Sequence, residues 1–207
     1  MSDTVKVQNT YDKHANSYDQ DNAMMERMLF KKRVLFKKLR GRILEIGVGT
    51  GNNLPYYHPS AKVVALDFSP QMVKIASDKV KYLQLNNIQH IIVGDIQRLS
   101  DYFNANTFDY VTSTCVFCSV PDPIKGLLEV KKILKMNGKL VQIEHGLSNI
   151  RLLNFFMKFI DPLTVKLRGF HLARKPITNL ENAGFKILKQ TKIDPTGIVR
   201  FIISKPK

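Results

Sequence analysis

Three alternate glycines follow a short apolar segment, and this feature constrains the fold of the chain more than any other. Residues 42–46 have the composition of a buried strand, and Gly47, Gly49 and Gly51 come directly after it. Glycine has no Cβ, so such a turn can adopt positive φ, approach a ligand closely and present its amides to negative charge. The spacing G-x-G-x-G differs from the dinucleotide pattern G-x-G-x-x-G. The sequence therefore predicts a strand-to-helix turn at a nucleotide-like cofactor site.

Acidic residues end the next two predicted strands. The β-branched run 62–67 ends in Asp67, and the run 91–95 ends in Asp95. In a parallel sheet, a carboxylate at the tip of the second strand is placed to accept hydrogen bonds from ribose hydroxyls. Ser69 and Pro70 supply an N-cap and a first helical residue for the helix that follows. We therefore expect Asp67 to contact the ribose of a nucleoside.

Strands and helices alternate along the rest of the chain. Residues 108–113 and 139–144 are predicted strands, and residues 123–134 between them are a predicted helix. The 207 residues, 44% of them hydrophobic, suffice for one large core. The sequence therefore predicts one α/β domain. It shows no leader segment and no apolar run of the roughly 18 residues that a spanning helix needs, so we expect a cytoplasmic protein, and a monomer.

Two cysteines lie close together after the fourth predicted strand. A disulfide framework would need more cysteines than Cys115 and Cys118. Zinc binding by this pair with His145 or His171 would need a second pair at metal spacing. We expect buried thiols that line a pocket, and no metal site.

More than half of the net charge of +15 comes from residues 27–42, which hold eight basic residues and no acid. A predicted helix over about residues 22–39 places Met24, Met28, Leu35 and Leu39 on one side. Its cations could be a solvated face, could meet anionic lipid headgroups or could bind nucleic acid phosphates. The eight basic residues of this segment are Arg27, Lys31, Lys32, Arg33, Lys37, Lys38, Arg40 and Arg42.

These motifs resemble a known family. With Glu45 before the glycines, E-x-G-x-G-x-G resembles motif I of class I S-adenosylmethionine-dependent methyltransferases. Residues 11–19, Y-D-x-x-A-x-x-Y-D, resemble the opening of ubiquinone/menaquinone C-methyltransferases and of bacterial phosphatidylethanolamine N-methyltransferases. Residues 41–57 are closer to the phospholipid branch. Residues 115–123 and 169–174 are similar to methyltransferase-like, membrane-associated thiol methyltransferases.

The resemblance implies a Rossmann-like fold with a central, mostly parallel seven-stranded sheet, helices on both faces and an N-terminal helical lid. Residues 1–40 would form the lid and basic helix, 41–146 the cofactor-binding core, and 147–207 an acceptor-site insertion with the C-terminal strands. Tyr11 and Tyr18 are seven residues apart, so on one helix they would share a face, where cation–π attraction could favour a sulfonium. The expected S-adenosyl-L-methionine ligands are Tyr11, Tyr18, Glu45, Gly47, Gly49, Gly51, Asn52, Asp67, Phe68, Met72, Asp95, Ile96, Thr114 and Cys115.

The insertion after the fifth predicted strand indicates the acceptor. Its apolar positions between Leu152 and Leu163 recur at helical spacing, with cations beside them. In this family the insertion usually builds the acceptor site, so a lipid-like or hydrophobic acceptor is expected, although an ordinary core helix has the same pattern. The candidate catalytic residues are His145, as a base, and Tyr18. The candidate substrate-binding residues are Phe117, His145, Arg151, Phe155, Phe159, His171 and Arg174.

Several functions fit these features. The first is methyl transfer to a phospholipid amine, with a quinone precursor or a thiol as the alternative acceptor. A nucleic acid methyltransferase is the alternative from another class. The Asn/Asp-Pro-Pro-Tyr/Phe sequence that holds a flipped base is replaced by Ser113-Thr114-Cys115-Val116-Phe117, and Thr114 stands where DNA cytosine enzymes have a proline. A non-enzymatic cofactor-binding regulator is a third option. We expect any membrane contact to be peripheral, through the basic N-terminal helix.

Overall fold

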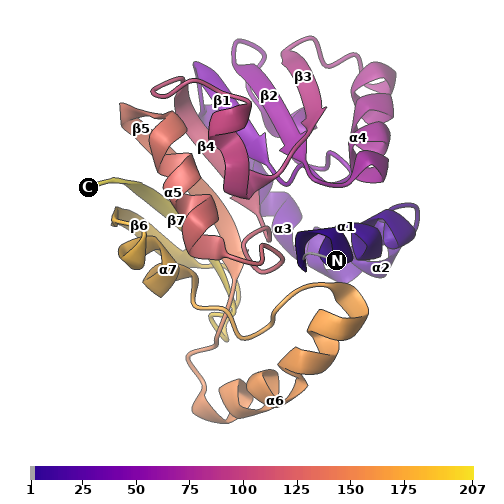
Figure 1. Ribbon diagram of the computed structural model, residues 1–207, viewed down its shortest axis with the longest axis vertical. Helices are drawn as coiled ribbons and strands as arrows, with labels where there is room; N and C mark the ends of the chain where they lie inside the picture. The colour runs from indigo at the N-terminus through magenta and orange to yellow at the C-terminus, as the bar shows by residue number, and fades with distance from the viewer. Residues whose placement is uncertain (1–2) are drawn as a thin grey trace.

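A seven-stranded sheet forms the centre of the computed structural model, which describes residues 3–207 (Figure 1). The strand order is β3-β2-β1-β4-β5-β7-β6, and β7 runs antiparallel to both of its neighbours while the other pairs are parallel. This confirms the predicted mostly parallel, Rossmann-like sheet. The strands are β1 Arg42–Ile46, β2 Lys62–Asp67, β3 Ile88–Val93, β4 Phe108–Thr114, β5 Leu134–His145, β6 Phe185–Lys192 and β7 Val199–Pro206.

Each face of the sheet carries its own hydrophobic core. Successive strand residues point to opposite faces, so Leu44 packs in one core and Ile43 in the other. Helices α5 (Pro123–Ile133) and α7 (Pro176–Asn182) cover the first core, and α4 (Pro70–Tyr82) covers the second. Short 3-10 turns, η2 (Leu54–Tyr56) and η3 (Ile96–Asp101), follow β1 and β3.

The predicted cap of α4 is present. The Ser69 hydroxyl accepts a hydrogen bond of 3.1 Å from the Met72 amide, and Pro70 opens the helix. Because β1, β2 and β4 are parallel, their carboxyl ends meet at one edge of the sheet. This edge carries the glycine turn, Asp67 and Thr114, and it is therefore where a ligand would bind.

The basic N-terminal segment does not form the single predicted helix. Helix α3 (Ala23–Arg33) ends early, and η1 (Val34–Lys38) continues as a 3-10 turn. Met24 is 89% exposed, so it does not join the apolar side, whereas Arg33 is 5% exposed and does not belong to the basic surface. Burial of Leu29 and Phe36 requires the chain to bend onto the core, and this tertiary packing overrides a continuous helical period.

The two lid tyrosines lie on different helices, contrary to the expectation of one shared face. Tyr11 belongs to α1 (Asp3–His14), and Tyr18 opens the short α2 (Tyr18–Asp21) after a turn in which the Ser17 amide donates to the His14 carbonyl. The ring centroids are nevertheless 6.1 Å apart. The turn between α1 and α2 therefore brings the two rings together, and a continuous helix is not needed to do so.

Helix α6 (Arg151–Arg168) lies at one end of the molecule, beyond the lid helices and away from the sheet (Figure 1). It ends at Gly169, whose φ of +75° is left-handed. The residues that follow return toward the carboxyl edge of the sheet. Among residues 3–207, no helix has both the length and the apolar character needed to cross a membrane.

Candidate cofactor and acceptor site

The glycine turn shapes the floor of the site. Gly47 has a φ of +62°, and a Cβ there would lie 2.5 Å from the Val116 side chain. Gly51 packs closely against Ala76 of α4 and does not line either of the two cavities described below, unlike Gly47 and Gly49. A Cβ on Gly49 would meet no protein atom within 4 Å. The space above Gly49 is therefore open, as a close-fitting cofactor requires.

A first cavity lies over the ends of β2 and β3. Asp67 is buried in its wall and accepts hydrogen bonds of 2.9 Å from the amides of Gly49 and Ser69. Burial raises the pKa of Asp67 to about 6, although the two amides oppose that shift. A carboxylate has further lone pairs for ribose hydroxyls. The same cavity is lined by the predicted residues Phe68, Met72, Asp95 and Ile96.

A second cavity adjoins the first beneath the lid. Both are lined by Tyr11, Tyr18, Gly47, Gly49, Thr114 and Cys115. The second extends past Asn52 and His145 to apolar side chains of the C-terminal part, Phe170, Leu172 and Ile198. A ligand that reaches from the first cavity to the second would pass between the glycine turn and the two tyrosines. The arrangement suits a nucleoside at one end and an apolar acceptor at the other.

Hydrogen bonds fasten the lid over these cavities at two places. From α1, Gln8 donates to the Phe68 carbonyl at 2.8 Å and Asp12 accepts from the Ser69 hydroxyl at 2.5 Å. From α2, Asp19 accepts from the Thr50 hydroxyl at 2.7 Å and from the Asn52 amide at 2.9 Å. The lid is thus tied both to the residues after β2 and to the glycine turn.

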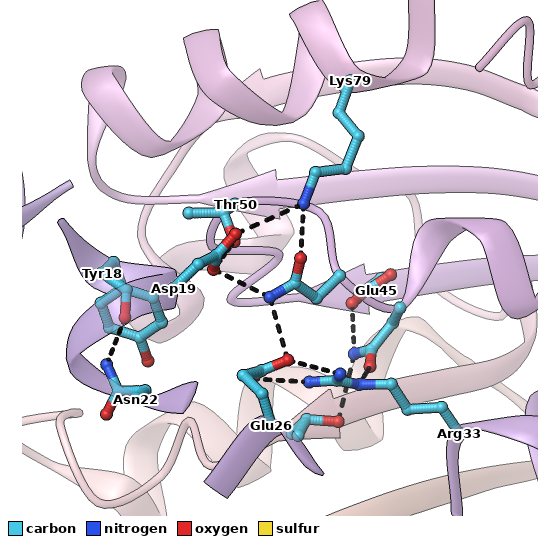
Figure 2. Close-up of polar contacts among 11 residues, drawn as sticks. Tyr18, Asp19, Asn22, Glu26, Arg33, Glu45, Thr50 and Lys79 are labelled. Carbon is cyan, nitrogen blue, oxygen red and sulfur yellow. Dashed lines mark hydrogen bonds and ion pairs between the residues drawn. The ribbon is translucent and has the colours of Figure 1, made fainter. Parts of the chain in front are cut away.

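A buried polar network beside the second cavity was not predicted (Figure 2). Arg33 donates two hydrogen bonds to Glu26, at 2.5 and 2.8 Å, and one to the Asn53 side-chain oxygen at 2.8 Å. Asn52 also donates to Glu26, at 3.0 Å. Glu26, Arg33 and Asn53 all line the cavity. No sequence signal separated Arg33 from the seven other cations of its segment.

Glu45 belongs to this network and does not line either cavity, contrary to its predicted role as a cofactor ligand. It is fully buried and accepts a hydrogen bond of 2.7 Å from Asn53, which also donates to the Thr114 hydroxyl at 3.1 Å. Burial raises the pKa of Glu45 to about 7. Through this hydrogen bond Glu45 positions Asn53, which itself lines the second cavity.

The loop after β4 is held from below by Glu144. This carboxylate accepts hydrogen bonds from the Ser113 hydroxyl at 3.0 Å and the Val116 amide at 3.2 Å, and burial raises its pKa to about 7. The loop places Cys115 at a φ of +53°, between the two cavities. Phe117, a predicted substrate residue, turns instead into the core beneath α5, where it contacts the Gly126 position.

Both cysteines are free thiols that line the second cavity. Burial raises the pKa of Cys115 well above its usual range and that of Cys118 to about 12. Both therefore stay protonated and are poor nucleophiles. Among residues 3–207, no group of three or more His, Cys, Asp and Glu side chains is placed to hold a metal ion.

His145 lies in the wall of the second cavity with its ring edge-on to Phe170, at a centroid separation of 5.7 Å. Burial lowers its pKa to about 4. The imidazole is therefore neutral at physiological pH and a weaker base than a catalytic base near pH 7 would be. A neutral ring can still orient a polar group of the acceptor.

This pKa shift makes a testable prediction. Between pH about 6.5 and about 4 the unfolded chain binds a proton at His145 that the folded chain does not, so the free energy of unfolding falls as the pH falls. From pH 7 to pH 5 the wild type should lose about 2 kcal/mol more than His145→Gln. Chemical denaturation of both proteins at the two pH values measures this difference. Parallel losses would contradict the buried, neutral histidine.

Other predicted substrate residues lie outside both cavities. Arg151, Phe155 and Phe159 are exposed on α6, and the two phenylalanines are 66% and 80% exposed. The apolar stripe of α6 therefore faces solvent and not the cavity mouth. His171 and Arg174 line a separate groove beside α1. A helical period identifies which residues share a face, but it does not say which way the face points.

The chain is similar in sequence to known methyltransferases. Residues 44–142 match the family model of a methyltransferase domain. The chain is 29% identical over 164 residues to a phosphatidylethanolamine N-methyltransferase of Cereibacter sphaeroides, and the matched residues cover 78% of each protein. It is 30% identical over 182 residues to the thiol S-methyltransferase TMT1B of Homo sapiens, covering 82% of this chain and 73% of that protein. It is also 30% identical over 176 residues to a demethylmenaquinone methyltransferase of Listeria welshimeri, covering 76% and 72%.

A solved structure shares the fold at lower identity. The SAM-dependent methyltransferase from Aquifex aeolicus aligns with a TM-score of 0.62 and 20% identity, over 86% of this chain and 88% of that one. The chain therefore belongs to the class I S-adenosylmethionine-dependent methyltransferases and uses S-adenosyl-L-methionine as its cofactor.

Proposed function

We propose that the protein transfers a methyl group to the amine headgroup of a phospholipid. The relatives act, by their names, on a phospholipid amine, a thiol and a demethylated quinone, so the family alone leaves the acceptor open. The observation that carries the proposal is the buried wall of the second cavity, where Cys118 is 3% exposed and burial raises the pKa of its thiol.

The same burial would act on the charge of an acceptor held against this wall. Burial disfavours a charged form, so an acceptor thiol or phenol in the same place would ionise less readily than in water. An ammonium would lose its proton more readily, and the resulting neutral amine is the nucleophile. The carboxylate of Glu26, which would favour an ammonium, is already paired with Arg33. The cavity therefore activates an amine without a strong base.

The residues present fit the cofactor. Asp67 would accept from the ribose, Asp95 would face the adenine, and the tyrosines of the lid would lie over the sulfonium. When bound, S-adenosylmethionine supplies a methyl group on a positively charged sulfur. The transfer forms a nitrogen–carbon bond as the carbon–sulfur bond breaks, so the protein's task is alignment and exclusion of water. Tyr18 and His145, both neutral, are the proposed catalytic contacts to the amine.

The apolar end of the second cavity supports a lipid in preference to a small amine. Phe170, Leu172 and Ile198 line this end together with His145, which is neutral at physiological pH. Burial of apolar surface contributes about 25 cal/mol per Å². Acyl chains near the headgroup would bury apolar surface against these side chains and so bind more tightly. A free ethanolamine has no acyl chain to bury.

The experiment is transfer of label from methyl-labelled S-adenosylmethionine to a mixture of phospholipid extract, quinone precursor, small thiols and RNA, followed by identification of the labelled product. We expect label in the amine phospholipid. Label in the thiol or quinone fraction would replace the proposed acceptor within the same enzyme class. Label in RNA would overturn the lipid acceptor altogether, and activity would then fall steeply with salt. Asp67→Ala protein, with its expected weaker cofactor binding, serves as the low-activity control.

A further inference from the structure

Helix α6 exposes a continuous apolar stripe to solvent. The side chains on it are large, and an isolated soluble domain rarely leaves so many on one helix unpartnered. Phe159 is the most exposed of them, at 80%. The exposed apolar residues at the start of α6 and along it are Ile150, Leu152, Phe155, Phe156, Phe159, Ile160, Leu163 and Leu167.

The opposite face of α6 attaches the helix to the protein. Met157 is buried there, and Asp161 accepts hydrogen bonds from the His171 ring at 2.8 Å and the Ala173 amide at 2.7 Å. At the end of the helix, Arg168 pairs with Asp21 of α2 at 3.2 Å. The helix is therefore fixed by its inner face and its C-terminal end, and the stripe contributes nothing visible to the fold.

Positive charge surrounds the stripe. Arg151 and Lys158 are exposed on α6. A groove between α1 and the end of α6 is lined by Lys6, Lys166, His171 and Arg174, and no carboxylate lies in its wall. Basic side chains near a bilayer attract anionic lipid by about 1 kcal/mol each. An apolar stripe bordered by cations is the pattern of an interfacial helix, which lies in the plane of a membrane.

We propose that α6 docks the protein onto an anionic bilayer, with its apolar stripe among the acyl chains and the adjoining basic groove against lipid phosphates. The surface assigned here differs from the basic α3 segment expected from the sequence. Helix α3 buries Leu29 against the core, whereas the apolar side of α6 remains free to insert. Vesicle binding can be measured without methyl transfer. A negative result for membrane docking would therefore leave the proposed acceptor untouched, and a different acceptor would leave the docking surface untouched.

The position of α6 connects this surface to the site. Gly169 ends the helix, and the next residue, Phe170, lines the second cavity and contacts His145. Docking through α6 therefore places the apolar end of the second cavity next to the headgroup layer. A lipid acceptor could reach the cavity without leaving the bilayer, and this step of the argument rests on the proposed function.

The chain contains no tryptophan, so a single introduced one reports on its own surroundings. Phe159→Trp should show a blue shift and quenching by brominated lipids when phosphatidylcholine vesicles containing phosphatidylglycerol are added. The matched control is Tyr82→Trp, at an 86% exposed position on α4, which should show neither effect. Quenching at both positions, or at Tyr82→Trp alone, would overturn the assignment to α6.

Loss of the stripe gives the second readout. Phe155→Ser with Phe159→Ser should lower affinity for the same vesicles by at least about tenfold, since each ring buried in lipid contributes well over 1 kcal/mol. The control Tyr82→Ser should bind as the wild type does. Thermal unfolding checks that all variants fold. Transfer to an acceptor dispersed in detergent should be unchanged, which separates docking from catalysis.

Two outcomes would replace this inference. If Lys31, Lys32, Lys37 and Lys38→Glu abolishes vesicle binding while the Phe155→Ser, Phe159→Ser protein binds normally, α3 is the docking surface. If sedimentation without lipid shows a dimer that the serine variant dissociates, the stripe is an interface between two copies. Retention of monomer mass by both wild type and variant, together with lipid quenching at Phe159→Trp, would support docking.

Discussion

Asp67→Ala should weaken binding of S-adenosylmethionine by at least about tenfold. The change removes a buried carboxylate that accepts hydrogen bonds from the Gly49 and Ser69 amides, and that faces the first cavity with its remaining lone pairs. Hydrogen bonds to a charged group contribute about 1.5–3 kcal/mol each. The glycine turn also loses the anchor of its central residue. Titration calorimetry with the purified variant measures the effect.

The matched control is Asp109→Ala, at the opposite edge of the sheet. Asp109 also accepts from a backbone amide, that of Arg42 at 2.8 Å, and pairs with Lys135 at 2.7 Å. Its removal should lower stability without a change in cofactor affinity. If both variants bind S-adenosylmethionine equally well, Asp67 is not a cofactor ligand. If both bind equally poorly, the loss reflects general destabilisation.

Glu26→Ala should lower the free energy of unfolding by about 3–5 kcal/mol, the usual cost of leaving one partner of a buried ion pair alone. The Arg33 side chain is 7% exposed, and Glu26 accepts two of its hydrogen bonds. Without Glu26 a buried guanidinium faces the second cavity with its hydrogen bond to Asn53 but without its ion-pair partner. Chemical denaturation monitored by circular dichroism gives the value.

Two further variants test the cause. Glu26→Leu combined with Arg33→Met removes both charges, and it should recover most of the lost stability because apolar pairs commonly replace buried ion pairs at little cost. Asp78→Ala breaks the exposed ion pair between Lys74 and Asp78, whose side chains are 72% and 59% exposed respectively. This change should lower the free energy of unfolding by under about 1 kcal/mol. A loss for Glu26→Ala as small as that for Asp78→Ala would show that Arg33 is solvated.

The cofactor half of the site was predictable because its requirements are local. A turn that passes close to a ligand needs glycine, so Gly47 and Gly49 are visible in the sequence, and a strand that ends in an acid identifies Asp67. The N-cap at Ser69 follows from the same local rules. The fold follows from the alternation of strands with helices or short 3-10 turns, which leaves few topologies open.

The acceptor half depends on packing between distant segments, which the sequence does not show. Phe155 and Phe159 have the correct helical period for a buried face, yet the structure turns that face outward. Arg33 and Lys32 are neighbouring cations in the same basic segment. Of the two, only Arg33 donates hydrogen bonds to Glu26 and Asn53. Tyr11 and Tyr18 were correctly grouped for an incorrect reason, since a turn and not a helical period brings them together.

The break between α1 and α2 gives the lid two parts that are fastened separately. Gln8 and Asp12 tie α1 to the residues after β2, above the first cavity, while Asp19 ties α2 to the glycine turn. If α1 alone swings away, the first cavity opens and the second loses Tyr11 from its wall, while Tyr18 of α2 and Glu26 of α3 still line it. Spent cofactor could then leave from the first cavity without release of the whole lid.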